Sequence, residues 1–149
     1  MDKKAFTLIE LVIGVGVLLM TILGLLAVYN QSLVLNTYSR GHTLALQSVQ
    51  GKMEEMRDHT YSQLVTDYGG APGNTFNPAG LNGKGVIFLD NVSVPGITSV
   101  RIIVCWKEKE RLFGEDTNLN GALDGGEDRN GNGLLDSPVE IVSYLTNSS

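Results

Sequence analysis

The chain of 149 residues contains a single cysteine, so an intramolecular disulfide is impossible and a zinc site built from cysteines is excluded. Positive charge is also scarce, because 11 Lys and Arg residues stand against 16 Asp and Glu residues, for a formal net charge of -5. A general nucleic-acid-binding protein needs clustered basic charge to displace counterions from phosphates, so that class is not expected. The length indicates one domain, or one domain plus an anchor, and 7% aromatic residues allow a modest core without a large enzyme cleft.

Charge is missing altogether from Leu11 to Ser39, and the run Leu11–Tyr29 within this stretch is 19 residues long. As a helix with a rise of about 1.5 Å per residue, this run spans roughly the 30 Å hydrocarbon core of a bilayer. Lys3 and Lys4 flank one end of the run. Cytoplasmic flanks carry the excess of Lys and Arg, so we expect the short N-terminus to stay in the cytoplasm and the rest of the chain to cross the membrane.

Two simpler interpretations of the apolar run fit less well. A cleaved secretory signal would have small residues at a cleavage site after the apolar stretch, and the segment 27–30, Ala-Val-Tyr-Asn, is a poor match. A plain membrane anchor leaves Glu10 unexplained. An ionised carboxylate at the edge of a lipid-embedded helix is costly, so such a residue usually has a partner or a function.

The segment 3–10, Lys-Lys-Ala-Phe-Thr-Leu-Ile-Glu, and the apolar run after it resemble the processing motif of type IV prepilins and type II secretion pseudopilins. The resemblance implies that prepilin peptidase cuts between Ala5 and Phe6 and methylates the new amine of Phe6, although the family usually has Gly at the position of Ala5. It also implies that Glu10 pairs with the N-terminal amine of a neighbouring subunit during assembly. Residues 1–5 are then the leader, and residues 6–29 are the transmembrane and assembly helix.

The physical chemistry of a helical bundle agrees with these implied roles. A methylated amine at Phe6 and a carboxylate at Glu10 carry opposite charges, and in a dry bundle such a pair is strongly favoured over an unpaired Glu. The resemblance further implies a single-pass protein of the inner membrane with a periplasmic C-terminal domain, which later enters a pilus or pseudopilus at the cell surface. Its expected partners are the peptidase and other pilins or pseudopilins along the N-terminal helix.

Residues 30–66 are predicted to continue as an amphipathic helix on a sheet, because their apolar side chains recur at steps of three and four. The sequence Met-Glu-Glu-Met-Arg at 53–57 resembles the helix of minor pilins of the pilus-modification kind and of the I-type minor pseudopilin of type II secretion. Residues 67–85 are rich in Gly, Pro and Asn and are expected to form a connecting loop. The apolar stripe of the helix consists of Leu46, Val49, Met53, Met56, Thr60 and Leu64.

Residues 86–149 are predicted to form a β-domain. The expected fold class is therefore α+β and pilin-like, with a long N-terminal helix packed on a small antiparallel β-sheet. Side chains alternate across a strand, so the even-numbered residues from Val100 to Trp106 share one face and Cys105 lies on the opposite face. The expected strands are 86–89, 92–94, 100–106 and 139–145, with a turn at Pro95-Gly96.

The acidity of the chain is concentrated in one insertion, residues 114–138, between the last two predicted strands. From Glu115 to Glu140 there are seven acidic residues and one basic residue, which makes this segment -6 and the rest of the chain +1. Two consecutive copies of Asp-x-Asn-x-Asn-Gly-x-Leu-Asp begin at Asp116 and Asp128 and repeat with a period of 12. The acidity is thus the property of one repeated local motif.

This motif predicts two calcium-binding loops. Oxygens at positions one, three and five surround a hard cation, Gly at six allows a sharp turn, a backbone carbonyl donates at seven and a carboxylate at nine. A set of oxygen ligands favours calcium over a transition metal. The first loop ends on Glu127 at position twelve, whereas the second has Val139 there, which leaves Glu140, Glu127 or Asp128 to compensate. The candidate ligands are Asp116, Asn118, Asn120, Ala122, Asp124 and Glu127 in the first loop and Asp128, Asn130, Asn132, Leu134 and Asp136 in the second.

The second loop begins directly after the first, which leaves no room for the helices of an EF-hand pair. The array instead resembles the bare calcium loops of thrombospondin type 3 and dockerin repeats. Leu123 and Leu135, each at position eight, are expected to point inward as a small core. Without metal the carboxylates repel one another, so we expect calcium binding to fold this segment.

The sequence therefore predicts a structural minor pilin of a type IV pilus with a calcium-stabilised β-domain. A type II secretion minor pseudopilin, or a calcium-gated adhesion module at a filament tip, would share the same features. An enzyme is not expected, because the sequence offers no nucleophile–base pair, no phosphate-binding Gly loop and no acid/base dyad outside the acidic insertion.

Overall fold

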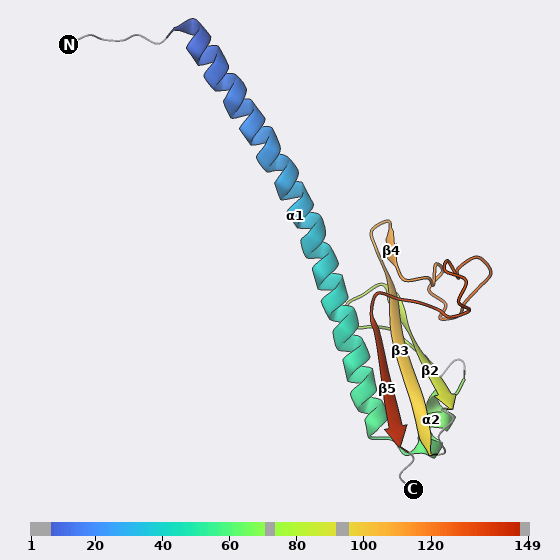
Figure 1. Ribbon diagram of the computed structural model, residues 1–149. Helices are drawn as coiled ribbons and strands as arrows, with labels where there is room; N and C mark the ends of the chain where they lie inside the picture. The colour runs from blue at the N-terminus through green and yellow to red at the C-terminus, as the bar shows by residue number, and fades with distance from the viewer. Residues whose placement is uncertain (1–6, 71–73, 92–95, 147–149) are drawn as a thin grey trace. The chain divides into compact units, whose positions relative to one another are not determined.

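The computed structural model describes residues 7–70, 74–91 and 96–146 and has an α+β architecture (Figure 1). The predicted leader, the cleavage residues Ala5 and Phe6, and the predicted strand 92–94 with Pro95 lie outside the described residues. The chain divides into two compact units, Met1–Ser39 and Arg40–Ser149. The elements are α1 (Leu8–Arg57), α2 (Tyr61–Tyr68), β1 (Thr75–Phe76), β2 (Gly83–Asn91), β3 (Ile97–Glu108), β4 (Arg111–Phe113) and β5 (Glu140–Thr146).

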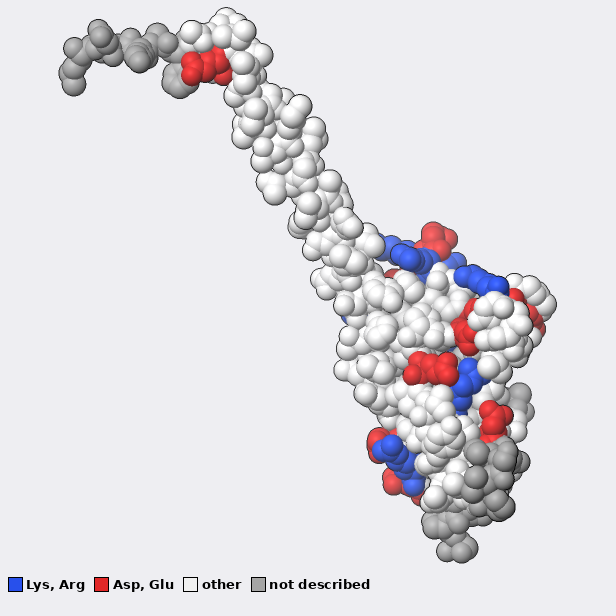
Figure 2. Space-filling view, in the orientation of Figure 1, with Lys and Arg blue, Asp and Glu red and all other residues white. Residues whose placement is uncertain are grey.

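The described part of the first unit is the beginning of α1, and nearly all its side chains are exposed. Its surface is uncharged beyond the first turn of the helix (Figure 2). The few hydroxyl groups bond within the helix itself, since the Thr21 hydroxyl donates to the Val17 carbonyl oxygen at 2.9 Å. A helix that satisfies its own polar groups suits a lipid environment. Among the described residues, α1 is the one helix long and apolar enough to span a membrane.

The described strands of the second unit form a five-stranded antiparallel sheet in which β3 is central. On one side β3 pairs with the whole length of β2, and β2 pairs in turn with the short β1. On the other side the end of β3 pairs with β4 and its first part pairs with β5. Because β4 and β5 share one edge of β3, the segment that joins them must leave the sheet and return to it (Figure 1).

One face of β3 packs on the helices, as the alternation predicted. Val100, Ile102, Val104 and Trp106 are fully buried in one cluster with Val49 and other residues of α1 and α2. Cys105 lies in a second cluster on the opposite face, which also confirms the sequence-based assignment. The rest of the helix stripe follows the prediction at Met53, Met56 and Leu64, which are all buried.

The predicted helix 30–66 is interrupted, and Thr60 does not join the apolar stripe. α1 ends at Arg57, and Thr60 is exposed with an extended backbone as the N-cap of α2. The Thr60 backbone N–H donates to the Gln63 side-chain oxygen at 2.9 Å, which satisfies a donor that a continuous helix would have bonded internally. Tyr68 then ties α2 back to α1, since its hydroxyl donates to a Glu55 carboxylate oxygen at 2.8 Å.

The predicted connecting loop 67–85 contains more regular structure than its composition indicated. α2 extends into it to Tyr68, β1 occupies Thr75–Phe76, and β2 begins at Gly83, not at residue 86. Phe76 pairs with Gly85, and the Phe76 ring covers the space where a side chain of Gly85 would lie. An aromatic ring over a strand glycine compensates for the missing side chain, so this pairing survives in a glycine-rich segment.

Gly41 is a buried residue of α1 that lies close to Trp106 of the sheet within the second unit. A Cβ atom there would lie 2.8 Å from Trp106 Nε1 and 3.2 Å from Glu108 Oε2, whereas Gly51 has no neighbouring atom within 4 Å of the same position. We predict that Gly41→Ala lowers the free energy of unfolding by about 1–3 kcal/mol, the usual range for overpacking a core. Gly51→Ala is the matched control and raises it by up to about 1 kcal/mol through helix propensity.

The measurement is chemical unfolding of the full chain in detergent, followed by the fluorescence of Trp106, the single tryptophan. Equal effects of the two substitutions would contradict the close packing of Trp106 on the helix.

Candidate functional site

The acidic loops, residues 114–138, connect β4 to β5 and contain no helix or strand of their own (Figure 1). They lie on the face of the sheet opposite the helices, where Leu135 is buried in a cluster with Val86, Ile103 and Cys105. Leu123 packs against the same cluster and is partly buried. Both position-eight leucines therefore point inward as predicted, and the small core that they form includes the sheet.

The first loop is organised around the Asp116 carboxylate, which is fully buried. Its two oxygens accept hydrogen bonds from the backbone N–H groups of Asn120 at 3.0 Å and Gly121 at 2.8 Å. The side-chain amides of Asn118 and Asn120 each donate to Asp124 Oδ2 at 2.8 Å. Positions one, three, five and nine of the motif are thus brought to one side of the loop.

The second loop repeats the first residue by residue. One oxygen of Asp128 accepts from the Gly133 backbone N–H at 2.8 Å, and the amides of Asn130 and Asn132 donate to Asp136 Oδ2 at 2.6 and 2.8 Å. Both position-six glycines have left-handed backbones, with φ of 85° at Gly121 and 73° at Gly133. A side chain at such a position would be strained, which explains the glycine of the motif.

The first loop is closed by Glu127. Its carboxylate is 4% exposed and accepts hydrogen bonds from the backbone N–H groups of Thr117 at 2.7 Å and Asp124 at 2.9 Å. Thr117 and Asp124 are the second and ninth residues of the loop. Hydrogen bonding, first from the Thr117 hydroxyl and then from the Asp124 backbone N–H, holds the pKa of Glu127 below its usual value.

The second loop is closed by Glu115, a residue that the sequence analysis missed. The Glu115 carboxylate is 8% exposed and accepts from the backbone N–H groups of Arg129 at 3.1 Å and Asp136 at 3.3 Å. Arg129 and Asp136 are the second and ninth residues of their loop, so Glu115 has the same partners in the second loop that Glu127 has in the first. A Glu-Asp pair that recurs at the repeat period, at 115–116 and 127–128, is the signal that could have identified it.

The sequence offers three residues that could replace Val139 at position twelve of the second loop. Of these, Glu140 lies next to Arg101 on the sheet and not at the loop. Its Oε2 atom is 3.8 Å from Nη1 of Arg101 on β3, whose guanidinium also donates to the Leu135 carbonyl oxygen at 3.1 Å. Glu127 bonds to the first loop, and Asp128 begins the second. Glu115 therefore makes the backbone contacts in the second loop that Glu127 makes in the first.

The six carboxylates between Glu115 and Asp136 form no ion pair within the part of the chain that the structure describes. Nor do three or more His, Cys, Asp or Glu side chains gather there into one metal-binding group. A cation site in these loops would also need the Asn side-chain oxygens and the carbonyls of Ala122 and Leu134. Such an all-oxygen donor set fits a hard cation such as Ca²⁺ and does not fit zinc.

Glu10, the predicted assembly residue, lies in the first turn of α1 with an exposed side chain. Its backbone N–H donates to the Thr7 carbonyl oxygen at 3.1 Å, so the helix is already formed at this point.

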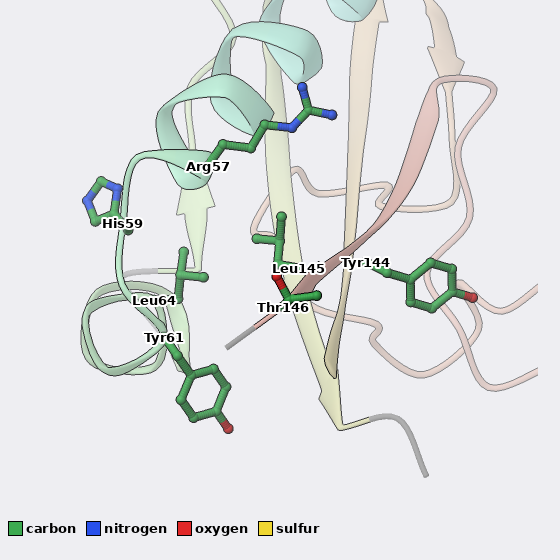
Figure 3. Close-up of a pocket in the computed structure, with 7 residues that line it drawn as sticks. All are labelled: Arg57, His59, Tyr61, Leu64, Tyr144, Leu145 and Thr146. Atoms are coloured by element: carbon green, nitrogen blue, oxygen red, sulfur yellow. The ribbon is translucent and has the colours of Figure 1, made fainter. Parts of the chain in front are cut away.

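A pocket of about 280 Å³ lies where the end of α1, α2 and the end of β5 meet (Figure 3). Its volume is below the usual range of ligand sites. The guanidinium of Arg57, which lines the pocket, already forms an ion pair with the Glu54 carboxylate at 2.7 Å. His59 Nδ1 lies 2.8 Å from the Glu55 carbonyl oxygen. The pocket therefore offers weaker chemistry than the loops, and it is lined by Arg57, His59, Tyr61, Leu64, Tyr144, Leu145 and Thr146.

Comparisons of this chain with protein-family models, with curated proteins and with solved structures find no match.

The hydrogen bonds of Glu127 predict a pH dependence in calcium-free buffer. Because its pKa is lowered in the folded protein, the ionised form adds stability that is complete above the pKa of the unfolded chain and is lost as the pH falls through the folded value. We expect Glu127→Gln to lower the unfolding temperature by several degrees at neutral pH and to have no effect at a pH below the folded pKa.

Glu110→Gln is the control, because the side chain of Glu110 is 99% exposed. Thermal unfolding followed by circular dichroism at a series of pH values measures both variants. A Glu127→Gln effect that is the same at all pH values would contradict the assignment.

Proposed function

We propose that the chain is a minor pilin subunit of a type IV pilus, held first in the inner membrane and then assembled through its N-terminal helix. In this proposal prepilin peptidase cleaves between Ala5 and Phe6 and methylates the Phe6 amine. Two features of the fold support it, namely the long apolar α1 and the small antiparallel sheet on which residues 40–57 of that helix pack. The periplasmic part would then be the second unit, which carries the acidic loops.

The observation that carries the proposal is the position of Glu10. It is the one acidic or basic side chain between Thr7 and Ser39, and it lies in the first turn of α1. An ionised carboxylate at the edge of a membrane helix is costly, and no basic residue of this segment can neutralise it. A neighbouring subunit's N-terminal amine would remove that cost and fix the register between helices, which gives Glu10 a role in assembly.

The same features would serve a type II secretion minor pseudopilin. The Met-Glu-Glu-Met-Arg segment at 53–57 supports this alternative, with Met53 and Met56 buried against the sheet. The two functions differ in the machine that the subunit joins, so the assembly experiment below examines both filaments.

We also propose that the acidic loops bind two Ca²⁺ ions. The support is the set of hydrogen bonds that the two loops share, together with the all-oxygen donor set. When bound, each cation would neutralise carboxylates that have no basic partner among the described residues. Asp116, Asn118, Asn120, the Ala122 carbonyl, Asp124 and Glu127 would hold the first ion, and Asp128, Asn130, Asn132, the Leu134 carbonyl, Asp136 and Glu115 would hold the second.

The assembly role of Glu10 is tested in cells that express prepilin peptidase and the pilus machinery. We expect the mature wild-type protein to begin at Phe6 and to be recovered in sheared pili, or in pseudopili in the alternative case. Glu10→Ala should insert and be processed in the same way but be at least about tenfold depleted from filaments, since every 1.4 kcal/mol of lost pairing is tenfold in an equilibrium.

Glu110→Ala removes an exposed carboxylate far along the chain and is expected to assemble normally. A mature protein that begins near Ala27, or a Glu10→Ala variant that enters filaments as well as the wild type, would sink the proposal.

Calorimetry of the full chain in detergent tests the calcium sites. We expect two Ca²⁺ ions to bind the wild type, one to bind Glu115→Gln, and none to bind the double variant Asp116→Ala with Asp128→Ala. Glu140→Gln is the matched control and should keep both sites, because Glu140 faces Arg101. If Glu140→Gln loses a site and Glu115→Gln does not, the closing residue is wrongly assigned; if the wild type binds no calcium, both sites are disproved.

A further inference from the structure

The outer face of the sheet, opposite the helices, is covered by the acidic loops. Val86, Ile103 and Cys105 are fully buried on this face, although no described helix packs there. Their cover consists of Leu135, which is 2% exposed, and of Leu119 and Leu123, which pack against the same cluster. The burial of this face therefore depends on the order of a segment that has no helix or strand of its own.

The two ends of the acidic segment close around Cys105. Gly114 lies so near that a Cβ atom on it would overlap the Cys105 sulfur, and φ of 107° at Gly114 is a backbone that favours glycine. The Cys105 thiol donates to the Asp136 carbonyl oxygen at 3.8 Å. The Glu115 backbone N–H donates to the same oxygen at 2.9 Å, which joins the start of the segment to its end directly over the thiol.

The closing contacts on the sheet are few and are concentrated in the second loop. The Arg101 guanidinium donates to the Leu135 carbonyl oxygen at 3.1 Å, and the Ser137 hydroxyl donates to the Val104 carbonyl oxygen. Against them stands the repulsion of six carboxylates held within one short segment. The loops also have their own hydrogen bonds, so the cap can close without metal, and a bound cation that neutralises the carboxylates would shift the balance toward the closed form.

We propose that the acidic loops are a calcium-dependent cap, which holds Cys105, Val86 and Ile103 sealed when calcium is bound and opens more often to expose this apolar face when calcium is removed. The inference rests on the calcium binding proposed above, but it concerns the sheet beneath the loops. Cys105 is fully buried in the capped form, so a reagent in solution has no access to its sulfur. The exposure of this one surface would thus depend on periplasmic calcium, which keeps it covered.

The size of the effect follows from mass action. For each calcium site that binds the capped form alone, the ratio of capped to uncapped molecules rises by a factor of 1 + [Ca²⁺]/Kd, which is about 100-fold at 100 times the dissociation constant, and the factors of two such sites multiply. A reagent that modifies only the uncapped form then reacts in proportion to its population, provided that the cap opens and closes faster than the reagent reacts. Because the chain has one cysteine, the labelling signal has a single source.

The experiment labels the full chain in detergent with a polar maleimide, with calcium at 100 times its Kd or with a chelator, and follows the mass change over time. We expect labelling of Cys105 to be at least about 100-fold slower with calcium in the wild type and in the control Glu110→Gln. The double variant Asp116→Ala with Asp128→Ala should label quickly in both buffers. Leu135→Ala should still bind calcium by calorimetry but label faster than the wild type in its presence.

Two results would overturn the cap. One is calcium binding by calorimetry with equal labelling rates in both buffers, which would leave the calcium sites standing without the cap. The other is a loss of the near-ultraviolet signal of Trp106 when calcium is removed, because global unfolding would then explain the labelling. A wild type that binds no calcium would instead disprove the proposed metal sites, and the cap would fall with them.

Discussion

The burial of β3 on both faces is the constraint on which the second unit depends. Every residue from Val100 to Trp106 is buried, whereas β5 alternates between exposed and partly buried side chains. A strand with one solvated face needs one covering layer, but β3 needs two. The helices provide the layer over Trp106, and the acidic loops provide the layer over Cys105. The insertion therefore takes the place of a structural layer, although its own composition is polar.

The alternation of side chains was sufficient to predict both faces of β3 and the α+β class, but it could not locate the break between α1 and α2. Met56 and Leu64 are eight residues apart, close to two helical turns, so the apolar stripe continues through the break in register. The break is made by local hydrogen bonding, in which Gln63 caps the backbone of Thr60. No proline or glycine lies at the break, and the spacing of apolar residues carries no information about a hydrogen bond between residues as close in sequence as Thr60 and Gln63.

The repeat predicted the internal structure of both loops, whose position-one, position-six and position-eight residues all behave as the motif implies. It failed at the closing residue of the second loop. Within a loop the twelfth position follows the ninth along the chain, and that rule leads to Val139. Glu115 comes from the other end of the segment and reaches Asp136 across 21 residues, because β4 and β5 hold both ends at one edge of β3. Sheet topology, which spacing alone does not contain, supplies that contact.

Two segments of the chain, residues 7–39 and the acidic loops, hold carboxylates that form no ion pair among the described residues. Glu10 is the one acidic or basic side chain between Thr7 and Ser39, and the loop carboxylates rely on backbone N–H groups and Asn amides. Hydrogen bonds from neutral donors stabilise an ionised carboxylate but leave its charge in place, so repulsion and membrane insertion still act on the net charge. Both groups of carboxylates therefore leave a requirement for positive charge that, in the two proposals, a partner outside the chain meets. The assembly and calcium proposals are two versions of this requirement, since a neighbouring amine meets it at Glu10 and a divalent cation meets it in the loops.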